Sequence, residues 1–502
     1  MIKNTEKKKI QIPVVFIGKP QWEAGWPYLG FDNNEFVDSI TNHIQNKYPE
    51  INFLQNEIVT TYNEQLIEKI KNDLSIADGL LIYTIGHYGD PGIIRAGLEI
   101  INHKKMPCIL ANLIYAGDHT FIKIYTSIKD KENYVHPISS ENLEDFDKYL
   151  QILFNIISLR GEKLLVFASD KRERNWKQIT NLITLERKQI LQNHPEYFNQ
   201  ASKMKDDDFE FFIDLEGRDQ AHPWRKNPIE YKEDLLNIFG VDLIREDPDK
   251  ILNYYDKVDE KEAESIADKW IKNAESVEPS EKSIVNSAKL YLAFKNLLED
   301  LNCNFFAPDC GTLLLLGKMP AYPCMAFFEL IKDNIYGICE SDTNSAISFM
   351  LGLYVANKPG FVSNHTLDLI NNRITYMHCV VPCNLEEEGN PSLKYDMVYH
   401  GESNLIGVSP RVKFPKNKTV TTIKVSVSKN KIAIRKGKII DNVEKKGGCV
   451  SKMLVEGNAK EILENYDWKS FGWHRVTFLG DLLQEFEIGA KLLGLKIIQE
   501  DI

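Results

Sequence analysis

The first 160 residues alternate between short apolar runs and longer segments in which apolar residues recur at helical spacing. The runs cover 12–18, 79–86 and 106–113, and the helical segments cover 35–48, 67–74 and 93–102. Strands that are apolar at every position are typical of a parallel sheet with helices on both faces. The pattern therefore predicts a doubly wound α/β domain over 1–160, with binding loops after Gly18 and Gly86.

A second domain of the same class is predicted over 161–355. It starts with an apolar run at 163–169, and a strand at 239–247 and helices at 260–274 and 287–302 follow. The charged stretch 203–228 is interpreted as an irregular excursion from this domain. The complete fold class is thus α/β, with two Rossmann-like parallel-sheet domains before a third, different one.

The remaining residues, 356–502, change in character. Strand-like segments separated by turns dominate from Arg373 onward, for example at 419–440 and 449–457. This pattern predicts a β-rich, barrel-like C-terminal domain. A final helix at 482–494 is expected to close it.

Composition excludes several classes of protein. The 502 residues are 43% hydrophobic and 26% charged, as in ordinary globular chains. The 61 Lys and Arg residues against 72 Asp and Glu residues give a net charge of −11, which disfavours nucleic acid and anionic membranes as partners. No apolar run approaches the roughly 20 residues of a membrane helix, and the N-terminus lacks the apolar core of a signal peptide. We therefore expect a cytoplasmic protein.

Six of the eight cysteines fall within 81 residues: Cys303, Cys310, Cys324, Cys339, Cys379 and Cys383. A structural zinc site requires paired cysteine knuckles, and only the last two have a similar spacing. Cytoplasmic thiols stay reduced, and free cysteines commonly fill cores as small hydrophobic residues. We therefore expect buried, reduced cysteines that do not bind the metal discussed below.

Three short segments gather carboxylates and imidazoles: Glu340 and Asp342; then Asn364, His365, Asp368 and His378; and finally His474. Oxygen and nitrogen ligands from separate segments suit a divalent cation such as Mn²⁺ that leaves positions open for substrate oxygens. Each residue also has a structural interpretation. Glu340 and Asp342 suit a helix cap, His378 suits a buried core histidine, and Asp368 suits a turn.

From about residue 286 onward, the sequence resembles the L-fucose/L-arabinose isomerase family. The similar strings are SAKLYLAFKNLLEDLNCNFFAPDC, AYPCMAFFELIKDNIYGICESD, NKPGFVSNHTLD, ITYMHCVVP and FGWHRVTFLGD. Their order and spacing fit the family over roughly 215 residues. The resemblance implies a metal-dependent aldose–ketose isomerase with two α/β domains and a β-rich C-terminal domain.

The same resemblance implies roles for individual residues. Glu340 matches the family's metal-binding and proton-transferring glutamate, His474 its C-terminal ligand, and His378 a further ligand. The family usually places an acid just after the Pro-Gly-Phe turn, where this chain has Asn364. Asp368 is the nearest acid, so we predict Glu340 and Asp368 as the catalytic pair. Together with His378 and His474 they are the predicted Mn²⁺ ligands.

The expected substrate is a free sugar, because no phosphate loop or arginine cluster lies near these strings. Further candidates for substrate or supporting contacts are Asn364, His365, His400, Trp22 and Trp26. Relatives of this kind form trimers or hexamers, so we expect a homo-oligomer. Two alternatives stay open, namely a non-catalytic sugar-binding homologue and a carbohydrate epimerase that uses the same enediolate step. A NAD-linked dehydrogenase is disfavoured because the glycine fingerprint is missing.

Overall fold

The computed structural model describes residues 9–19, 26–86, 90–131, 134–168, 224, 227–386, 393–401, 407–445 and 447–502. The chain divides into two compact units. One contains the chain up to Arg160 together with Gln484–Lys496, and the other contains Gly161–Leu483 with Ile497–Ile502. None of the described helices is long and apolar enough to cross a membrane.

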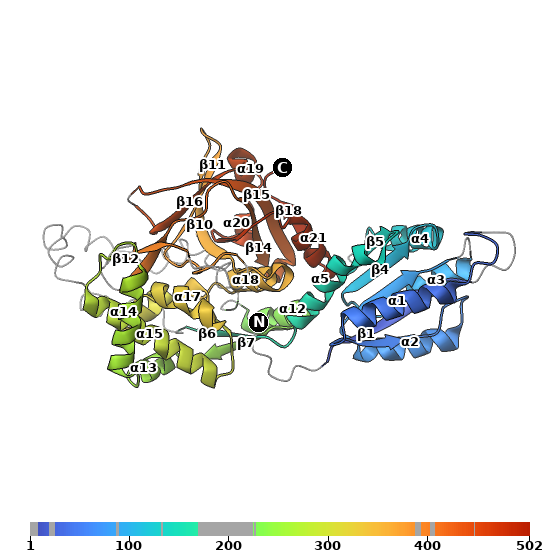
Figure 1. Cartoon of the computed structure of the whole chain (residues 1–502), viewed down its shortest axis with the longest axis horizontal. Coiled ribbons are helices and arrows are strands. Elements are labelled where there is room, and N and C mark those ends of the chain that lie inside the picture. Colours follow the sequence, from blue (N-terminus) through green and yellow to red (C-terminus); the bar gives the residue numbers. More distant parts are fainter. Residues whose placement is uncertain are drawn as a thin grey trace. The chain divides into compact units, whose positions relative to one another are not determined.

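The first unit, blue to teal in Figure 1, contains a sheet with helices around it. Its strands are parallel and run in the order β2-β1-β3-β4-β5. The strands are β1 (Gln11–Ile17), β2 (Asn52–Gln55), β3 (Leu80–Thr84), β4 (Cys108–Leu113) and β5 (Val135–Ser140). The helices are α1 (Asn33–Lys47), α2 (Glu64–Ile76), α3 (Pro91–Ile101), α4 (Asp118–Ile128), α5 (Asp147–Ser158) and α21 (Leu483–Leu492), with a 3₁₀ turn at Leu143–Phe146. The order is that of a doubly wound fold, as predicted.

Strand periodicity explains why helices cover both faces of this sheet. Val15 and Ile17 pack into a core made with α2, α3 and α4. The intervening Phe16 stacks on Tyr83, which contacts Phe146 on the opposite face. Successive side chains of a strand point to opposite faces, so a strand that is apolar throughout requires two cores.

The second unit begins with a parallel sheet in the order β7-β6-β8-β9. Its strands are β6 (Lys163–Phe167), β7 (Asp242–Glu246), β8 (Phe305–Pro308) and β9 (Tyr336–Gly337). Its helices are α12 (Pro228–Phe239), α13 (Asp249–Tyr255), α14 (Glu260–Asn273), α15 (Glu281–Asp300), α16 (Cys310–Leu315), α17 (Cys324–Leu330) and α18 (Thr343–Ala356), with 3₁₀ turns η2 (Ile331–Asp333) and η3 (Cys339–Ser341). Most of the predicted excursion at 203–228 lies outside the described residues. The second α/β sheet is confirmed.

The rest of this unit is a barrel-like sheet. Its strands are β10 (Phe361–Asp368), β11 (Arg373–His378), β14 (Thr419–Ser426), β15 (Lys431–Asn442), β16 (Ser451–Glu456), β17 (Arg475–Leu479) and β18 (Lys496–Gln499). Hydrogen bonds run in the order β14-β17-β10-β11-β16-β15-β18, and pairing of β14 with β15 closes a ring. Smaller elements accompany it, namely the β12 (Tyr395–Tyr399) and β13 (Val408–Val412) pair, η4 (Val427–Lys429), α19 (Ala459–Glu464) and α20 (Trp468–Phe471). The predicted β-rich, barrel-like fold is confirmed, and it shares one compact unit with the second α/β sheet.

The final helix differs from its predicted place. We expected α21 to close the barrel, but it belongs to the first unit. There Lys491 bonds to Tyr125 and Gln484 bonds to Tyr149. The chain then returns to the barrel unit as β18, beside β15.

Two fully buried arginines share one carboxylate inside the barrel unit. Arg435 and Arg475 bind Glu500 at 3.0 and 2.6 Å, and Arg435 also donates to the hydroxyl of Tyr376. Buried charges are tolerated when they are paired and hydrogen-bonded in this way. Glu500 follows β18 in the sequence. The carboxylate that neutralises the two arginines therefore comes after α21, the helix that belongs to the first unit.

Candidate metal centre

A strained turn presents Glu340. The chain leaves β9 at Gly337 and makes the turn η3 before α18 begins. Glu340 has φ 60° and ψ 24°, and Ser341 has φ 48°, so two successive residues adopt the left-handed conformation. Such backbone is unfavourable for residues other than glycine and clusters at functional sites. The Glu340 side chain is 51% exposed and thus accessible to a ligand.

Asp342 fixes the end of this turn. It is the N-cap of α18, where Oδ1 accepts the backbone N–H of Ser345 at 2.8 Å and Oδ2 accepts the Ser345 hydroxyl at 2.7 Å. Trp224 Nε1 also donates to the carbonyl of Ser341, at 3.2 Å. Capping satisfies backbone donors that a helix leaves open. The turn is therefore held from both sides.

Strand register brings two distant histidines to the same place. On β10, Ser363 pairs with Arg475 of β17 and Asn364 pairs with Met377 of β11. His474 directly precedes Arg475 and His378 directly follows Met377, so both flank the same end of β10. Their ring centroids lie 5.5 Å apart.

The imidazole of His474 bridges Asp342 and Glu340. Nδ1 lies 2.9 Å from Asp342 Oδ2, and Nε2 lies 3.6 Å from Glu340 Oε2. Because an ionised carboxylate only accepts hydrogen bonds, Nδ1 donates to Asp342, and Nε2 is the ring atom that faces Glu340. A histidine held by a carboxylate in this way is the usual arrangement behind a metal-ligating imidazole.

The Asp342 carboxylate also pairs with a buried lysine. Lys424 Nζ lies 2.7 Å from Asp342 Oδ2, and both side chains are only 1% exposed. Burial alone would raise the pKa of Asp342, but Lys424 and His474 together hold it well below its usual range. Asp342 is therefore a permanent anion that orients His474 and is unsuited to taking up a proton.

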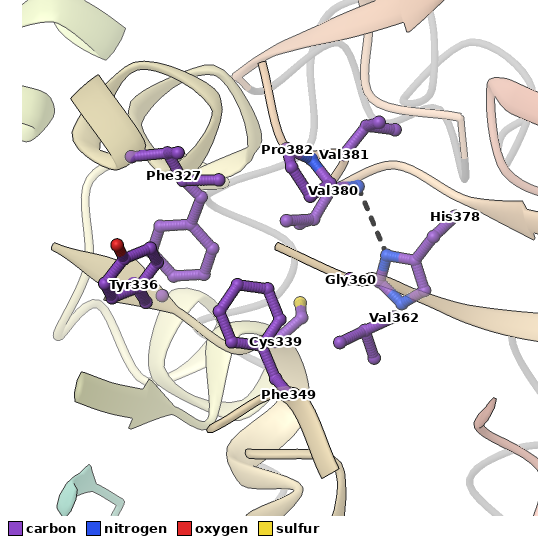
Figure 2. A pocket seen from close by; sticks show the side chains of 12 residues that line it. Phe327, Tyr336, Cys339, Phe349, Gly360, Val362, His378, Val380, Val381 and Pro382 are labelled. Atoms are coloured by element: carbon purple, nitrogen blue, oxygen red, sulfur yellow. Dashed lines mark hydrogen bonds between the residues drawn. The ribbon is translucent and has the colours of Figure 1, made fainter. Parts of the chain in front are cut away.

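His378 lines a small apolar pocket with side chains such as Phe327, Phe349 and Val380 (Figure 2). The cavity measures about 20 Å³, room for about one water-sized group. His378 Nδ1 accepts the backbone N–H of Val380 at 3.2 Å, and Nε2 has no partner among the described residues. Burial and the neighbouring His474 lower the pKa of His378 to about 4, so the ring is neutral near pH 7.

A thiol completes the group. Ligand atoms of Cys339, Glu340 and His378 all lie within 4.8 Å of one another. The Cys339 thiol donates to Cys310 Sγ at 3.3 Å, and this bond and burial raise the pKa of Cys339. All eight cysteines are free and buried, as predicted. The expectation that the thiols do not bind the metal stays a prediction, and Cys339 is the thiol that lies among the candidate ligands.

Asp368, the predicted second carboxylate, does not lie with Glu340. It ends β10, where it accepts hydrogen bonds from the backbone of Ile370 and Asn371 and from the Asn371 amide. Its register partner is Arg373, whereas His378 lies at the other end of β11. Five residues of strand separate these ends by roughly 17 Å. Asp368 is thus the turn residue of a hairpin, and we do not retain it as a ligand or base.

The first two supporting candidates lie near the histidines but differ in environment. Asn364 Oδ1 is buried and lacks a partner among the described residues. His365 is buried against Tyr466, and its carbonyl accepts Trp473 Nε1 at 2.7 Å. Burial and two nearby arginines lower the pKa of His365 well below its usual value. It is therefore a neutral core histidine.

The other candidates lie elsewhere. His400 stacks on Tyr322 at 3.7 Å, where burial opposes its charge but Cys324 and Cys379 raise its pKa. Trp26 is half exposed in the first unit and donates to the carbonyl of Ala116. Trp22 lies outside the described residues. His400 is therefore not a member of the group formed by Cys339, Glu340 and His378.

Three members of the site were missed as functional residues. The sequence places Asp342 in a segment rich in carboxylates and also predicts a helix cap there, but neither signal indicates that it orients His474. Cys339 was set aside with the other cysteines. Lys424 has no local signal at all, because its partner lies 82 residues earlier.

No protein-family model matches the chain, and no curated protein matches it significantly. The resemblance to the L-fucose/L-arabinose isomerase family therefore stays a prediction.

Proposed function

We propose that the chain is a divalent-metal-dependent aldose–ketose isomerase acting on a free sugar through a cis-enediolate, with Glu340 as the base. One observation carries the proposal. A buried anion, Asp342, holds Nδ1 of His474, so that Nε2 of the same ring faces the accessible carboxylate of Glu340, 3.6 Å away. The strings that resemble the isomerase family contain all three residues.

The residues present fit a divalent cation. Glu340, His474 and His378 offer a carboxylate and two imidazoles, a set that several divalent ions accept. Binding through His378 Nε2 would move the ring proton to Nδ1 and break the Val380 hydrogen bond, at a cost of about 1–3 kcal/mol. Metal sites of this kind contribute on the order of 10 kcal/mol, so the exchange is favourable.

A bound cation supplies positive charge that polarises a carbonyl and stabilises an adjacent enediolate. The remaining chemistry belongs to the chain. Glu340 takes the proton from C2 of the aldose and returns it to C1, while the hydroxyl proton at C2 is exchanged to the oxygen at C1. A cis-enediolate presents both carbons on one face, so one carboxylate suffices without Asp368. A positioned base of this type contributes about 10²–10⁴-fold to the rate.

Proton NMR in D₂O tests the reaction. Aldoses are incubated with the protein and divalent cations, and we expect deuterium at C1 of the ketose and loss of the C2 proton. Glu340→Gln should lower turnover by about 10²–10⁴-fold. The matched control is Asp368→Asn, which should leave turnover unchanged, because the amide oxygen still accepts the two backbone hydrogen bonds of the turn and only the bond from the Asn371 amide is lost.

Two results would contradict the proposal. Undiminished exchange in Glu340→Gln would remove the proposed base. Metal binding without exchange on any aldose would favour the sugar-binding alternative, whereas inversion at C2 without ketose would favour an epimerase.

The proposal extends to the setting of the reaction. A neutral sugar is supported by the pairing of the nearby basic residues. Lys318 and Arg411, which could have bound an acidic group, pair with Asp249 and Asp396. We propose a cytoplasmic homo-oligomer, a trimer or hexamer, which light scattering would test.

A further inference from the structure

We propose that the Cys339 thiolate is itself a ligand of the metal centre, which would make the site selective for a thiophilic cation such as Zn²⁺ over Mn²⁺. The inference depends on the proposed metal centre but not on the isomerase reaction. It departs from the Mn²⁺ expected from the sequence.

The backbone of η3 is what brings the thiol and the carboxylate together. In an extended strand, successive side chains point to opposite faces, so neighbours cannot reach one point. Here Ile338 is extended, and the chain then turns through left-handed conformations at Glu340 and Ser341. As a result, Cys339 Sγ and a Glu340 oxygen lie within 4.8 Å of each other and of a His378 nitrogen. A strained turn that places two adjacent donors with a third is a reason to look for a ligand that uses them.

Cys310 supports the same role. It follows β8, whose neighbour β9 leads to Cys339, and its sulfur lies 3.3 Å from Cys339 Sγ. With both thiols protonated, Cys339 donates to Cys310. When a cation binds and the Cys339 proton leaves to solvent, the direction reverses and the Cys310 thiol donates to the thiolate. Outer-shell donors of this kind orient and stabilise ligating groups.

The donor set determines the preference for a metal. Thiolate and imidazole ligands select zinc and other thiophilic ions, whereas manganese prefers oxygen. Cys339 faces His378 across the pocket, and the surrounding walls are apolar (Figure 2).

Cobalt(II) titration of the full-length protein tests the proposal, since Co²⁺ replaces Zn²⁺ and reports its ligands by absorption. We expect visible d–d bands together with an intense near-ultraviolet sulfur-to-cobalt charge-transfer band. In Cys339→Ser the charge-transfer band should disappear while d–d bands remain. The matched control, Cys303→Ser, removes a buried thiol outside the group and should keep both.

Competition measures selectivity. Zn²⁺ should displace Co²⁺ from the wild type at a concentration roughly 100-fold or more below that required of Mn²⁺. The ratio should shrink in Cys339→Ser. If that variant fails to fold, X-ray absorption at the zinc edge of the wild type gives the same information, through a sulfur scatterer at about 2.3 Å.

The outcomes separate this inference from the proposed function. Cobalt d–d bands without a charge-transfer band in the wild type, or a charge-transfer band that survives in Cys339→Ser, would overturn the thiolate ligand and leave the isomerase proposal intact. No cobalt bands at all would overturn the metal centre itself.

Discussion

Replacing Asp342 with asparagine separates what the buried carboxylate does for stability from what it does for the site. Asparagine is nearly isosteric and still caps a helix, so the N-cap of α18 loses only a few tenths of a kcal/mol. The charge is what disappears. Lys424, which is 1% exposed, then loses the carboxylate that lies 2.7 Å from its ammonium group.

The magnitude follows from that isolated lysine. Breaking a buried pair by removing one partner costs about 3–5 kcal/mol. Lys424 can instead lose its proton at pH 7, which costs no more than about 5 kcal/mol for a group with a normal pKa near 10.4. Both routes predict that Asp342→Asn lowers the free energy of unfolding by about 3–5 kcal/mol, measured by urea denaturation.

A second substitution isolates the cause. In Asp342→Asn/Lys424→Met both charges are gone, and the stability should recover to within about 1–2 kcal/mol of the wild type. Cation affinity should not recover, because His474 has lost the carboxylate that orients it. Loss of such a partner typically weakens binding 10–100-fold. A loss of less than about 1 kcal/mol in the single variant, or restored cobalt affinity in the double variant, would refute the reasoning.

Two further predictions concern packing and pH. A Cβ at Gly352 would lie 2.0 Å from the ring of Phe478, so Gly352→Ala should destabilise the protein by about 1–3 kcal/mol. Gly311 has open space around it, so Gly311→Ala should not destabilise the protein. Thermal denaturation compares the two variants. Burial, and next the charge of Lys491, lower the pKa of His136 to about 4. The unfolded chain therefore binds this proton more readily between pH 6.5 and 4, and the stability that the neutral ring contributes is lost as pH falls. We expect a loss of up to about 2 kcal/mol from pH 7 to 5, absent in His136→Gln; equal losses in both proteins would contradict this.

Local patterns in the sequence were sufficient for the α/β layers. Strands β1, β3 and β4 are each mostly apolar, and Asp32, Asn63 and Asp90 accept hydrogen bonds at the helix starts. Both signals act over a few residues. The unit to which α21 belongs could not be predicted from such local signals. Its apolar face fits either unit, and only long-range packing contacts determine which one it joins.

The candidate site shows the same division. Glu340, His378 and His474 could be identified from their strings, but their supporting contacts depend on register and on pairs far apart in sequence, such as Asp342 and Lys424. Asp368 is not retained as a candidate because each residue along a strand adds about 3.3 Å of distance. Four positions along β10 beyond Asn364 lead away from the histidines and into the turn.

The two buried arginines that share Glu500 impose an order on the folding of the barrel unit during synthesis. Arg435 and Arg475 emerge from a ribosome before α21, but the carboxylate that neutralises them is synthesised only after it. Until then, closing the barrel would bury two uncompensated cations, at several kcal/mol for each ion. The barrel unit therefore completes its folding only after α21, which belongs to the first unit, and then β18 and Glu500 have been synthesised. A nascent chain arrested before β18 should remain sensitive to protease in the barrel strands while β1–β5 are already protected.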